Sequence, residues 1–519
     1  MKARNRVIAV IAGLAAAATL LTGCLFSVIP DDQHSSRPTS GATTAPDSAG
    51  VAADLLPFYS QAVDWKSCTP GFDCATITAP LDWNDPGSGT VDLAIIRHRA
   101  SDGKPLGSLL VNPGGPGASG IALVRDSLQF AVGDTLSRSY DVIGFDPRGV
   151  GESTAVKCFD AKQMDAYLFD IPKAPRNTPA WRAEVLASGK TFADACKANS
   201  RGILPDITTV FAARDMDLTR AVLGDKKLNY LGYSYGTFLG ATYAKLYPQR
   251  VGRFVLDGAI DPSVSGLDVG VTQAIGFESA LKAYMVSCLK ARGCPFAGTV
   301  DDGMADLGAL LAKVDRTPLR SSDGRLLGAD SLTTAIVAAL YAQDSWPVLT
   351  QALAQVTRGD AATAFRLADF YYNRVNGRYQ DNSYEAFNAY NCMDYPDDAT
   401  PAQLTAAAAE LKQKAPTIAP YWSVDVNLCD VWPVKATGVR EQIHAPGAGP
   451  ILVIGTTNDP ATPYSWAQSL AKQLDSGILI TRVGQGHTGF NKGNACVDGV
   501  VNDYFVRGTV PSGDIRCPQ

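Results

Sequence analysis

The chain has 519 residues, of which 46% are hydrophobic and 19% are charged, a composition typical of a globular protein with a large core. The formal net charge is -5 and no block of Lys or Arg occurs, so we do not expect nucleic acid as a partner. The sequence contains 4 His, and its 11 Cys include no Cys-x-x-Cys pair, so no zinc site is expected, and the sequence predicts no other metal or cofactor.

Residues 1–23 predict a signal peptide. Basic residues near the N-terminus precede an apolar, Ala-rich run over 7–21, and small residues follow that run. Leu-Thr-Gly-Cys at 21–24 resembles the box of bacterial lipoproteins, in which the Cys thiol accepts a diacylglyceryl group. We therefore expect Cys24 to begin the mature chain and to anchor it by its acyl chains to the outer face of the cell membrane. The alternative is plain secretion with Cys24 discarded.

Residues 24–52 predict a lipidated N-terminus followed by a flexible tether, because Ser, Thr, Pro, Ala, Gly and Asp dominate there and cannot build a core. The ten cysteines beyond Cys24 favour export to an oxidising compartment. They allow many pairings, and the sequence alone does not choose between them. Their spacing suggests that neighbours pair in order and close five small loops: Cys68–Cys74, Cys158–Cys196, Cys288–Cys294, Cys392–Cys429 and Cys496–Cys517.

Apolar runs that end in Gly, Pro or Asp turns alternate with helical patterns, which predicts a mostly parallel, doubly wound α/β sheet. Two helical stretches, 157–205 and 262–448, interrupt this alternation. The second lies between two strands of the sheet, so we expect it to be a helical cap over the strand ends. The expected division is a first part of the core over 53–261, which includes the 157–205 insertion, the cap over 262–448, and a second part of the core over 449–519.

Gly-Tyr-Ser-Tyr-Gly at 232–236 follows a predicted strand and opens a predicted helix, as a nucleophile elbow requires. Gly-x-Ser-x-Gly alone is a weak signal, but this context favours Ser234 as a nucleophile over a Ser in an ordinary turn. A Ser hydroxyl needs a base, and His487, just after the last predicted strand, fits the chain order Ser, acid, His. Asp459 follows the preceding strand and is the expected acid, although Asp-Pro is also a common turn.

The oxyanion hole of such a site needs two backbone N–H groups. We expect one from Tyr235, directly after the nucleophile, and the other from Gly115 in the turn Asn-Pro-Gly-Gly-Pro-Gly over 112–117. A phosphate loop is excluded there because no Gly-Lys-Ser/Thr follows. Asp146 and Arg148, after the next strand, are expected to pair and fix their own loop.

Together these motifs resemble the actinobacterial tripeptidyl aminopeptidases, relatives of the prolyl iminopeptidases, over about residues 62–517. Further matching motifs are Gly-Phe-Asp-Pro-Arg-Gly (144–149), Leu-Asp-Gly-Ala (256–259), Asn-Cys-Met-Asp (391–394), Asp-Pro-Ala-Thr-Pro (459–463) and Gln-Gly-His-Thr (485–488). The resemblance implies the α/β-hydrolase fold with a helical cap, and an exported serine peptidase that releases short peptides, tripeptides, from free N-termini. The chain departs from the iminopeptidase pattern at Asn112, where those enzymes usually carry His.

An aminopeptidase must bind a protonated α-amino group, and a carboxylate in the cap would do so. Asp394, in the Cys-x-Asp motif, is the expected residue, with a structural Asp beside a disulfide as the alternative. Thr462 is expected to support Asp459 or to line the substrate pocket. Two other classes of function stay open: an exported esterase or lipase with the same triad, and a catalytically dead surface lipoprotein that only binds a partner.

Overall fold

A ten-stranded sheet organises the part of the chain that the computed structural model describes, residues 45–396 and 398–519. The predicted signal peptide, Cys24 and most of the tether lie outside these residues. The strands of this sheet are β1 (Lys66–Thr69), β2 (Phe72–Asp82), β3 (Asp85–His98), β4 (Ser108–Asn112), β5 (Asp141–Phe145), β6 (Leu228–Tyr233), β7 (Val251–Asp257), β12 (Ile451–Asn458), β13 (Gly477–Gln485) and β14 (Ile515–Cys517).

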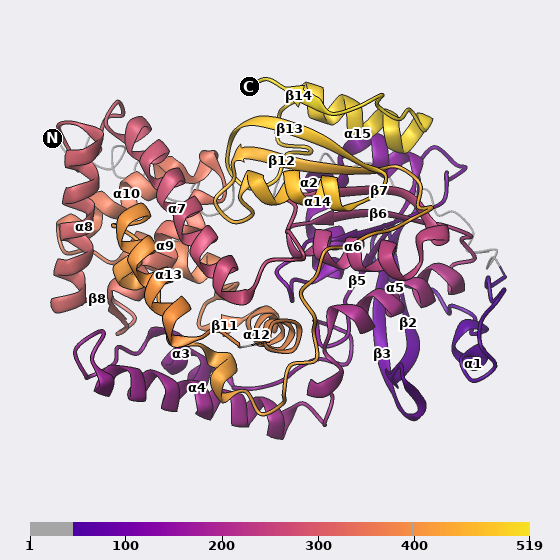
Figure 1. Ribbon diagram of the computed structural model, residues 1–519, viewed down its shortest axis with the longest axis horizontal. Coiled ribbons are helices and arrows are strands. Elements are labelled where there is room, and N and C mark those ends of the chain that lie inside the picture. Colours follow the sequence, from indigo (N-terminus) through magenta and orange to yellow (C-terminus); the bar gives the residue numbers. More distant parts are fainter. Residues whose placement is uncertain (1–44, 397) are drawn as a thin grey trace, which may run out of the picture. The chain divides into compact units, whose positions relative to one another are not determined.

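The strand order is β1-β2-β3-β5-β4-β6-β7-β12-β13-β14 (Figure 1). The pairs from β5 through β4 to β14 are all parallel, whereas β1, β2 and β3 form an antiparallel edge that joins β5. The central strands β4, β6 and β12 consist largely of buried Leu, Val, Ile and Tyr, as expected when helices cover both faces of a sheet. The predicted mostly parallel, doubly wound sheet is confirmed.

Helices from both halves of the sequence cover the two faces of this sheet. On one face α2 (Gly120–Ser139) and α15 (Ala495–Arg507) pack over a cluster that includes Val124 and Phe505. On the other face α5 (Thr209–Val222), α6 (Tyr235–Leu246) and α14 (Tyr464–Gln473) pack over a second cluster that includes Leu239 and Leu470. The short α1 (Leu56–Tyr59) joins the second cluster through Tyr59.

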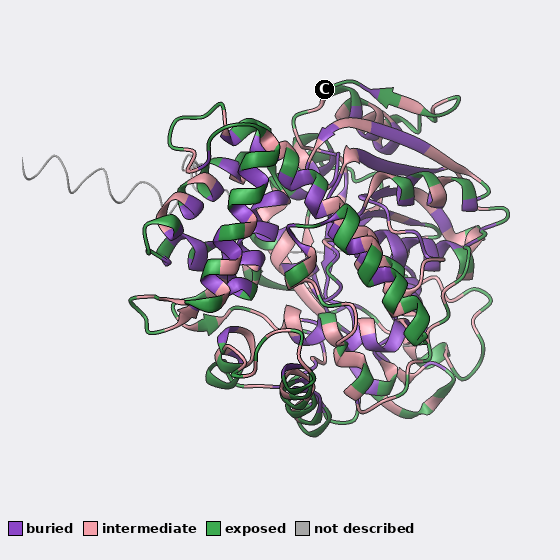
Figure 2. Cartoon of the chain, turned by 60° about the vertical axis from the view of Figure 1, so that its left-hand side comes forward, coloured by how far each residue is buried: buried purple, intermediate pink, exposed green. Residues whose placement is uncertain are grey.

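Between β7 and β12 the chain forms a mainly helical cap with a core of its own, in which helices turn buried faces inward and exposed faces outward (Figure 2). Among the described residues, no helix is long and apolar enough to cross a membrane. The cap helices are α7 (Gly266–Cys288), α8 (Val300–Arg316), α9 (Ala329–Leu340), α10 (Trp346–Thr357), α11 (Ala362–Tyr371), α12 (Ser383–Asp394) and α13 (Pro401–Lys414). Two small hairpins, β8 (Leu319–Arg320) with β9 (Leu326–Leu327) and β10 (Arg374–Val375) with β11 (Arg378–Tyr379), lie among them.

The chain returns from the cap to the sheet along an extended segment. Trp432, Ile443 and Ala445 of this segment pack in the same cluster as α5 and α6, so the end of the 262–448 stretch belongs to the packing of the sheet. Short 3-10 turns occur along the chain at η1 (Leu204–Asp206), η2 (Pro248–Arg250), η3 (Gln343–Ser345), η4 (Ala419–Tyr421) and η5 (Leu428–Val431).

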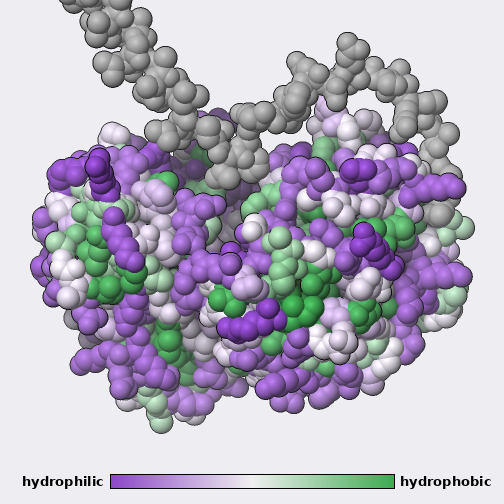
Figure 3. Space-filling model, turned by 90° about the horizontal axis from the view of Figure 1, so that it is seen from above, coloured by the Kyte–Doolittle hydropathy of each residue, from purple (hydrophilic) through white to green (hydrophobic). Residues whose placement is uncertain are grey.

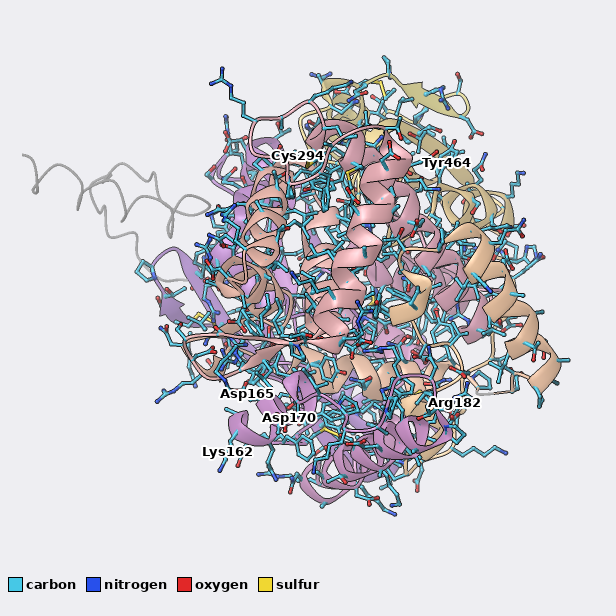
Figure 4. All side chains as sticks on the ribbon, turned by 90° about the vertical axis from the view of Figure 1, so that its left-hand side faces the viewer. Lys162, Asp165, Asp170, Arg182, Cys294 and Tyr464 are labelled. Atoms are coloured by element: carbon cyan, nitrogen blue, oxygen red, sulfur yellow. A yellow bond between two sulfur atoms is a disulfide. The ribbon has the colours of Figure 1, made fainter. Side chains whose placement is uncertain are left out.

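The 157–205 insertion forms α3 (Ala161–Phe169) and α4 (Pro179–Asn199), and both pack against the cap. The rings of Tyr167 and Phe192 stack at 4.7 Å, and both contact the Tyr384 ring of α12 at an angle. Asp165 of α3 also pairs with Arg374 of the cap at 2.8 Å. Figure 4 shows Asp165 and Arg182 on helices that lie below the cap helices. The insertion, although it interrupts the first half of the core in sequence, thus extends the cap in space.

Five disulfides join the ten cysteines in the order in which they occur along the chain, which is the local scheme that their spacing suggests. Cys158–Cys196 closes the insertion, and Cys392–Cys429 ties the end of α12 to η5. The other three are Cys68–Cys74, Cys288–Cys294 and Cys496–Cys517. Disulfides in this number belong to a protein that folds outside the reducing cytosol, so the chain is an exported protein.

Candidate active site

Ser234 lies at the sharp turn between β6 and α6, with φ 56° and ψ -122°, a conformation that non-glycine residues rarely adopt. Its N–H donates to the carbonyl oxygen of Asp257 at 2.8 Å, which fixes the turn to the end of β7. Both glycines of the motif are needed because a side chain at either position would not fit. A Cβ at Gly232 would lie 2.5 Å from the Gly236 carbonyl oxygen, and a Cβ at Gly236 would lie 2.8 Å from the Asn112 side chain. This geometry is that of a nucleophile elbow.

Asp459 and His487 meet at the carboxyl ends of the neighbouring parallel strands β12 and β13. The His487 Nδ1 lies 2.9 Å from Oδ2 and 3.0 Å from Oδ1 of Asp459, whose side chain is buried. The same carboxylate accepts hydrogen bonds from the N–H groups of Ala461, Thr462 and Thr488 at 3.0, 2.9 and 3.2 Å. These donors hold the carboxylate in one orientation, so the imidazole is held as well.

Thr462 supports this pair. Its Oγ1 lies 3.0 Å from Asp459 Oδ2 and 3.2 Å from His487 Nδ1. Of the two roles expected for Thr462, the structure shows support of the acid, and Thr462 does not line the cap pocket described below.

The other ring nitrogen of His487, Nε2, is buried and has no hydrogen-bond partner among the described residues. The His487 backbone N–H donates to the Tyr341 carbonyl oxygen of the cap at 2.8 Å, and the Tyr341 ring lies edge-on to the imidazole at 5.3 Å. Ser234 does not hydrogen-bond to Nε2 in the described structure, and such bonds often tighten only when substrate is bound. The ring is thus held through Nδ1, while Nε2 is left free for a proton.

The glycine-rich turn over 112–117 lies against the elbow. A Cβ at Gly114 would come within 2.4 Å of the Tyr233 carbonyl oxygen and 3.0 Å of the Tyr235 nitrogen. The Asn112 side chain accepts a hydrogen bond from the Gly114 N–H at 2.9 Å, so the turn survives the departure from His at this position. Tyr235 is the first residue of α6, and its N–H therefore has no acceptor within the helix. Gly115, the other expected donor, directly follows Gly114 in this turn.

Asp394 does not fit the expectation that it binds a substrate amine. Its side chain is buried at the end of α12, where Oδ1 accepts from the Thr209 N–H at 2.9 Å and Oδ2 from Thr209 Oγ1 at 2.6 Å. Burial raises the pKa of Asp394 to about 6, against the two Thr209 hydrogen bonds, which lower it. Thr209 Oγ1 also lies 2.5 Å from the Tyr235 hydroxyl. These contacts favour the structural alternative: Asp394 fixes the start of α5 and, through it, the Tyr235 side chain.

A pocket of about 280 Å³ opens in the cap, between the first turn of α7, one face of α12 and the segment that follows it. Phe387 of α12 lines this pocket. Its backbone nitrogen would lie 2.8 Å from a Cβ placed at Gly117, the last residue of the glycine-rich turn over 112–117, which we call the oxyanion turn. The pocket therefore begins on the helix that packs on that turn. Its lining combines apolar side chains, including Tyr395 and Trp422, with polar ones: Asn388, Asn391, Asn427 and Asp398.

Comparisons with known proteins agree with this geometry. The family model described as alpha/beta hydrolase fold matches residues 107–300, and the one described as TAP-like protein matches residues 415–517. Carboxylesterase B of Mycobacterium tuberculosis is 38% identical over 96% of this chain and 97% of its own length. Serine protease Hip1 of the same organism is 33% identical over 99% and 98%. Tripeptidyl aminopeptidase of Streptomyces lividans is 28% identical over 98% and 96%.

The chain belongs to the tripeptidyl aminopeptidase-like family of α/β-hydrolases. Both family models and full-length relatives support this assignment, which confirms the resemblance seen in the motifs. The named relatives comprise an esterase and two peptidases. The family therefore establishes a serine hydrolase, and the choice of substrate rests on the site.

Two residues that the motifs did not reveal contribute to this tripeptidyl aminopeptidase-like site. Tyr341 contacts His487 from the cap, and Thr209 connects Asp394 with Tyr235. No local pattern marks either residue, since each acts on a partner far away in the sequence. The expected pairing of Asp146 with Arg148 is wrong: Arg148 binds Asp215 through two nitrogens at 2.7 and 2.8 Å, and both side chains are fully buried.

Asp146 instead holds the loop by other contacts. Its carboxylate accepts from Ser119 Oγ at 2.6 Å and from the N–H groups of Ile121 and Glu152 at 3.2 and 2.8 Å. The loop is therefore tied to the start of α2, and Arg148 ties it separately to α5.

Proposed function

We propose that this protein is an exported serine peptidase that releases short peptides from free N-termini through an acyl-enzyme on Ser234. The observation that carries the proposal is the hydrogen-bonded pair of Asp459 and His487, which lies at the same ends of the parallel strands as the nucleophile elbow. The Nε2 of His487 has no hydrogen-bond partner among the described residues. In this mechanism Nε2 removes the Ser234 proton as Oγ attacks the scissile carbonyl, and the imidazolium is stabilised by Asp459.

The tetrahedral intermediate carries a negative oxygen, which the N–H groups of Gly115 and Tyr235 would bind. His487 then donates its proton to the leaving amine, and the ester bond between the acyl group and Ser234 remains. Water attacks the ester carbonyl while Nε2 takes its proton, and His487 then passes this proton to Ser234 Oγ as the ester bond breaks and the peptide is released as its carboxylic acid. Each proton passes through His487, so the enzyme returns to its starting state without a cofactor.

The lining of the cap pocket favours a peptide over a long acyl chain as substrate. The side-chain N–H groups of Asn388 and Asn391 donate to the Tyr384 and Phe387 carbonyl oxygens of their own helix at 2.7 and 3.0 Å, so their amide oxygens are left to accept from peptide N–H groups, which an acyl chain lacks. The Asp398 carboxylate complements the positive charge of a free N-terminus. Two of the relatives carry the name tripeptidyl aminopeptidase, and this name supports the length of the released peptide.

A panel of chromogenic substrates tests the proposal. Tripeptidyl, dipeptidyl and aminoacyl amides are compared, each with a free and an acetylated N-terminus, beside short and long acyl esters of nitrophenol. We expect the free tripeptidyl amide to have the highest kcat/KM and acetylation to lower it by at least about 100-fold, because one charge-assisted contact is lost. Preference for the long acyl ester would establish the esterase instead.

Ser234→Ala is the matched control in this panel, because it removes one hydroxyl and leaves the elbow glycines in place. Loss of the nucleophile typically costs several orders of magnitude in kcat, about 10⁶-fold in a well-studied serine peptidase. A folded Ser234→Ala protein that keeps its activity would contradict the proposal. Binding of peptides without turnover by the natural chain would support the partner-binding lipoprotein.

We further infer that the exported chain is anchored to the outer face of the membrane by lipid on Cys24. Support comes from the sequence alone: a basic start, an apolar run and Leu-Thr-Gly-Cys occur in the order that a lipoprotein signal requires. Two or three acyl chains on one residue suffice for stable attachment.

A further inference from the structure

Asp257 is a buried carboxylate at the centre of the site, and the mechanism above gives it no part. It is the last residue of β7, fully buried, and it pairs with Tyr233 of β6 on one side and with Ile454 of β12 on the other. It belongs to the motif Leu-Asp-Gly-Ala, to which the sequence assigned no role. Its position is therefore between the strand that carries Ser234 and the strand that carries Asp459.

All hydrogen bonds of this carboxylate come from the loop that carries His487. The Gly489 N–H donates to Oδ1 at 2.8 Å and to Oδ2 at 3.0 Å, and the Phe490 N–H donates to Oδ2 at 2.8 Å. At the same residue, the backbone carbonyl oxygen accepts from the Ser234 N–H at 2.8 Å. One residue thus binds the nucleophile elbow with its backbone and the His487 loop with its side chain.

The next residue, Gly258, makes this connection tighter. It has φ 69°, and a Cβ there would lie 3.0 Å from His487 Cε1, 3.1 Å from Thr488 Cγ2 and 3.2 Å from Thr462 Oγ1. Its N–H donates to the Ile454 carbonyl oxygen at 3.0 Å. Asp257 and Gly258 together therefore contact the segments that carry all three residues of the triad.

The strand order explains why such a contact is needed. The His487 loop begins at the end of β13, and β7 and β12 separate β13 from β6, which ends at Ser234. Neighbouring strands are about 4.8 Å apart, so the two strand ends are separated by about 14 Å. The loop must return across two strands to bring the imidazole to the nucleophile, and the sheet alone does not hold it there.

We propose that Asp257 is a positioning residue that sets the distance between Ser234 and His487. The inference rests on the proposed function, since it needs both residues to react. The groups that face the carboxylate are His487 and Lys492 from the loop and Tyr233 from β6, and Asp498 of α15 acts on the last two of these.

The electrostatics agree with the geometry. Burial raises the pKa of Asp257 to about 6, against the N–H groups of Phe490 and Gly489 and the charge of His487, which lower it. Because this interaction is mutual, the carboxylate also stabilises the imidazolium.

Asp257→Asn tests the inference. A fluorophosphonate first counts the reactive Ser234 in each preparation, and kcat and KM for nitrophenyl acetate, which needs no peptide pocket, are then expressed per reactive site over a range of pH. We expect kcat to fall by about 10- to 100-fold with KM nearly unchanged, because misplacement of a catalytic group by about 1 Å costs that much. A loss confined to kcat distinguishes a misplaced reacting group from a damaged binding site, which would raise KM.

Asp261→Asn is the matched control, because Asp261 is also a buried carboxylate near the end of β7 but binds Ser263 and Gln473 instead of the His487 loop. Its rate per reactive site should stay within about two-fold of the natural chain. Asp257→Glu, which keeps the charge but displaces it, should also lower kcat with KM nearly unchanged, and it decides the matter if Asp257→Asn yields no reactive protein.

An Asp257→Asn enzyme with the natural kcat would overturn the inference, and so would equal losses in Asp257→Asn and Asp261→Asn. The proposed function fails separately, if the natural chain does not react with the fluorophosphonate or if Ser234→Ala still reacts.

Discussion

At the scale of single residues, three buried carboxylates show that partners decide what a carboxylate does. Asp459 binds an imidazole as well as backbone donors, whereas Asp394 binds only Thr209. Asp257 binds the backbone of the loop that carries His487. The chain order Ser, acid, His correctly placed Asp459 beside His487, because the carboxyl ends of neighbouring parallel strands bring the two side chains together. Motif membership alone did not reveal that Asp394 is enclosed, since burial depends on residues far away in the sequence.

Asp394→Asn should leave the fold intact and change peptide turnover by no more than about three-fold, because the amide fills the same space and still accepts from the Thr209 N–H. Its stability should respond to pH. The folded pKa of Asp394, about 6, is above its ordinary value of 3.8, so the folded state holds a proton that the unfolded chain releases. The free energy of unfolding of the natural chain therefore falls as pH rises through this window, with a slope of up to about 1.4 kcal/mol per pH unit.

The Asn variant lacks this contribution, so its free energy of unfolding should fall less than that of the natural chain over the same window. Urea denaturation of both proteins at several pH values measures the difference. A loss of about 100-fold in turnover of free tripeptidyl amides, with ester turnover unchanged, would instead assign amine binding to Asp394 after all.

At the scale of elements, the oxyanion turn lies between two structures that fix it from opposite sides. Gly114 faces the nucleophile elbow, and Gly117 faces the first turn of α12, where a Cβ would lie 2.6 Å from the Ser383 carbonyl oxygen. α12 in turn reaches Asp394 and the Cys392–Cys429 disulfide at its other end. The cap therefore supports the oxyanion turn through α12, and it contacts His487 through Tyr341.

Gly114→Ala should impair the oxyanion hole without removing a reactive group. The new methyl group would collide with the backbone at Tyr233, so the turn must move away from the elbow, and a lost or misplaced donor costs about 100-fold or more in kcat. Gly103→Ala is the matched control, because Gly103 has a similar φ of 86° but open space around its Cβ position. Measurement of kcat per reactive Ser234 separates the two, and equal losses in both variants would show that backbone strain alone is responsible.

The same elements show what the sequence can predict. Strands, the elbow and the oxyanion turn have local patterns of apolar residues and glycines, so their order along the chain was enough to place them. Contacts across the chain have no such pattern: the partner of Arg148 is Asp215, 67 positions away, and Asp165 of the 157–205 insertion binds Arg374 of the cap, 209 positions away. Sequence reasoning found the triad but not the supports of that triad in the cap.

At the scale of the whole molecule, the described part of the chain has the features of a protein that works outside the cytosol. Five disulfides close local loops, and each can stabilise the fold by about 2–4 kcal/mol. Hydrophilic residues spread over most of the face in Figure 3, with apolar residues in separate patches between them. On this face nothing resembles a broad apolar surface that would hold the folded body to lipid.

Cys24→Ala should therefore release the protein from the membrane. The lipid would be the anchor, because Leu-Thr-Gly-Cys ends the predicted signal peptide, and the tether of Ser, Thr, Pro and Gly adds little affinity for lipid. Cell fractionation followed by an activity assay measures the partition: the natural chain should stay with the membrane and the variant should appear in the soluble exported fraction with its kcat unchanged. Ser27→Ala, a substitution in the tether just after the lipid site, controls for changes near the signal peptide. If Cys24→Ala stays in the membrane fraction, an attachment other than lipid on Cys24 holds the protein there.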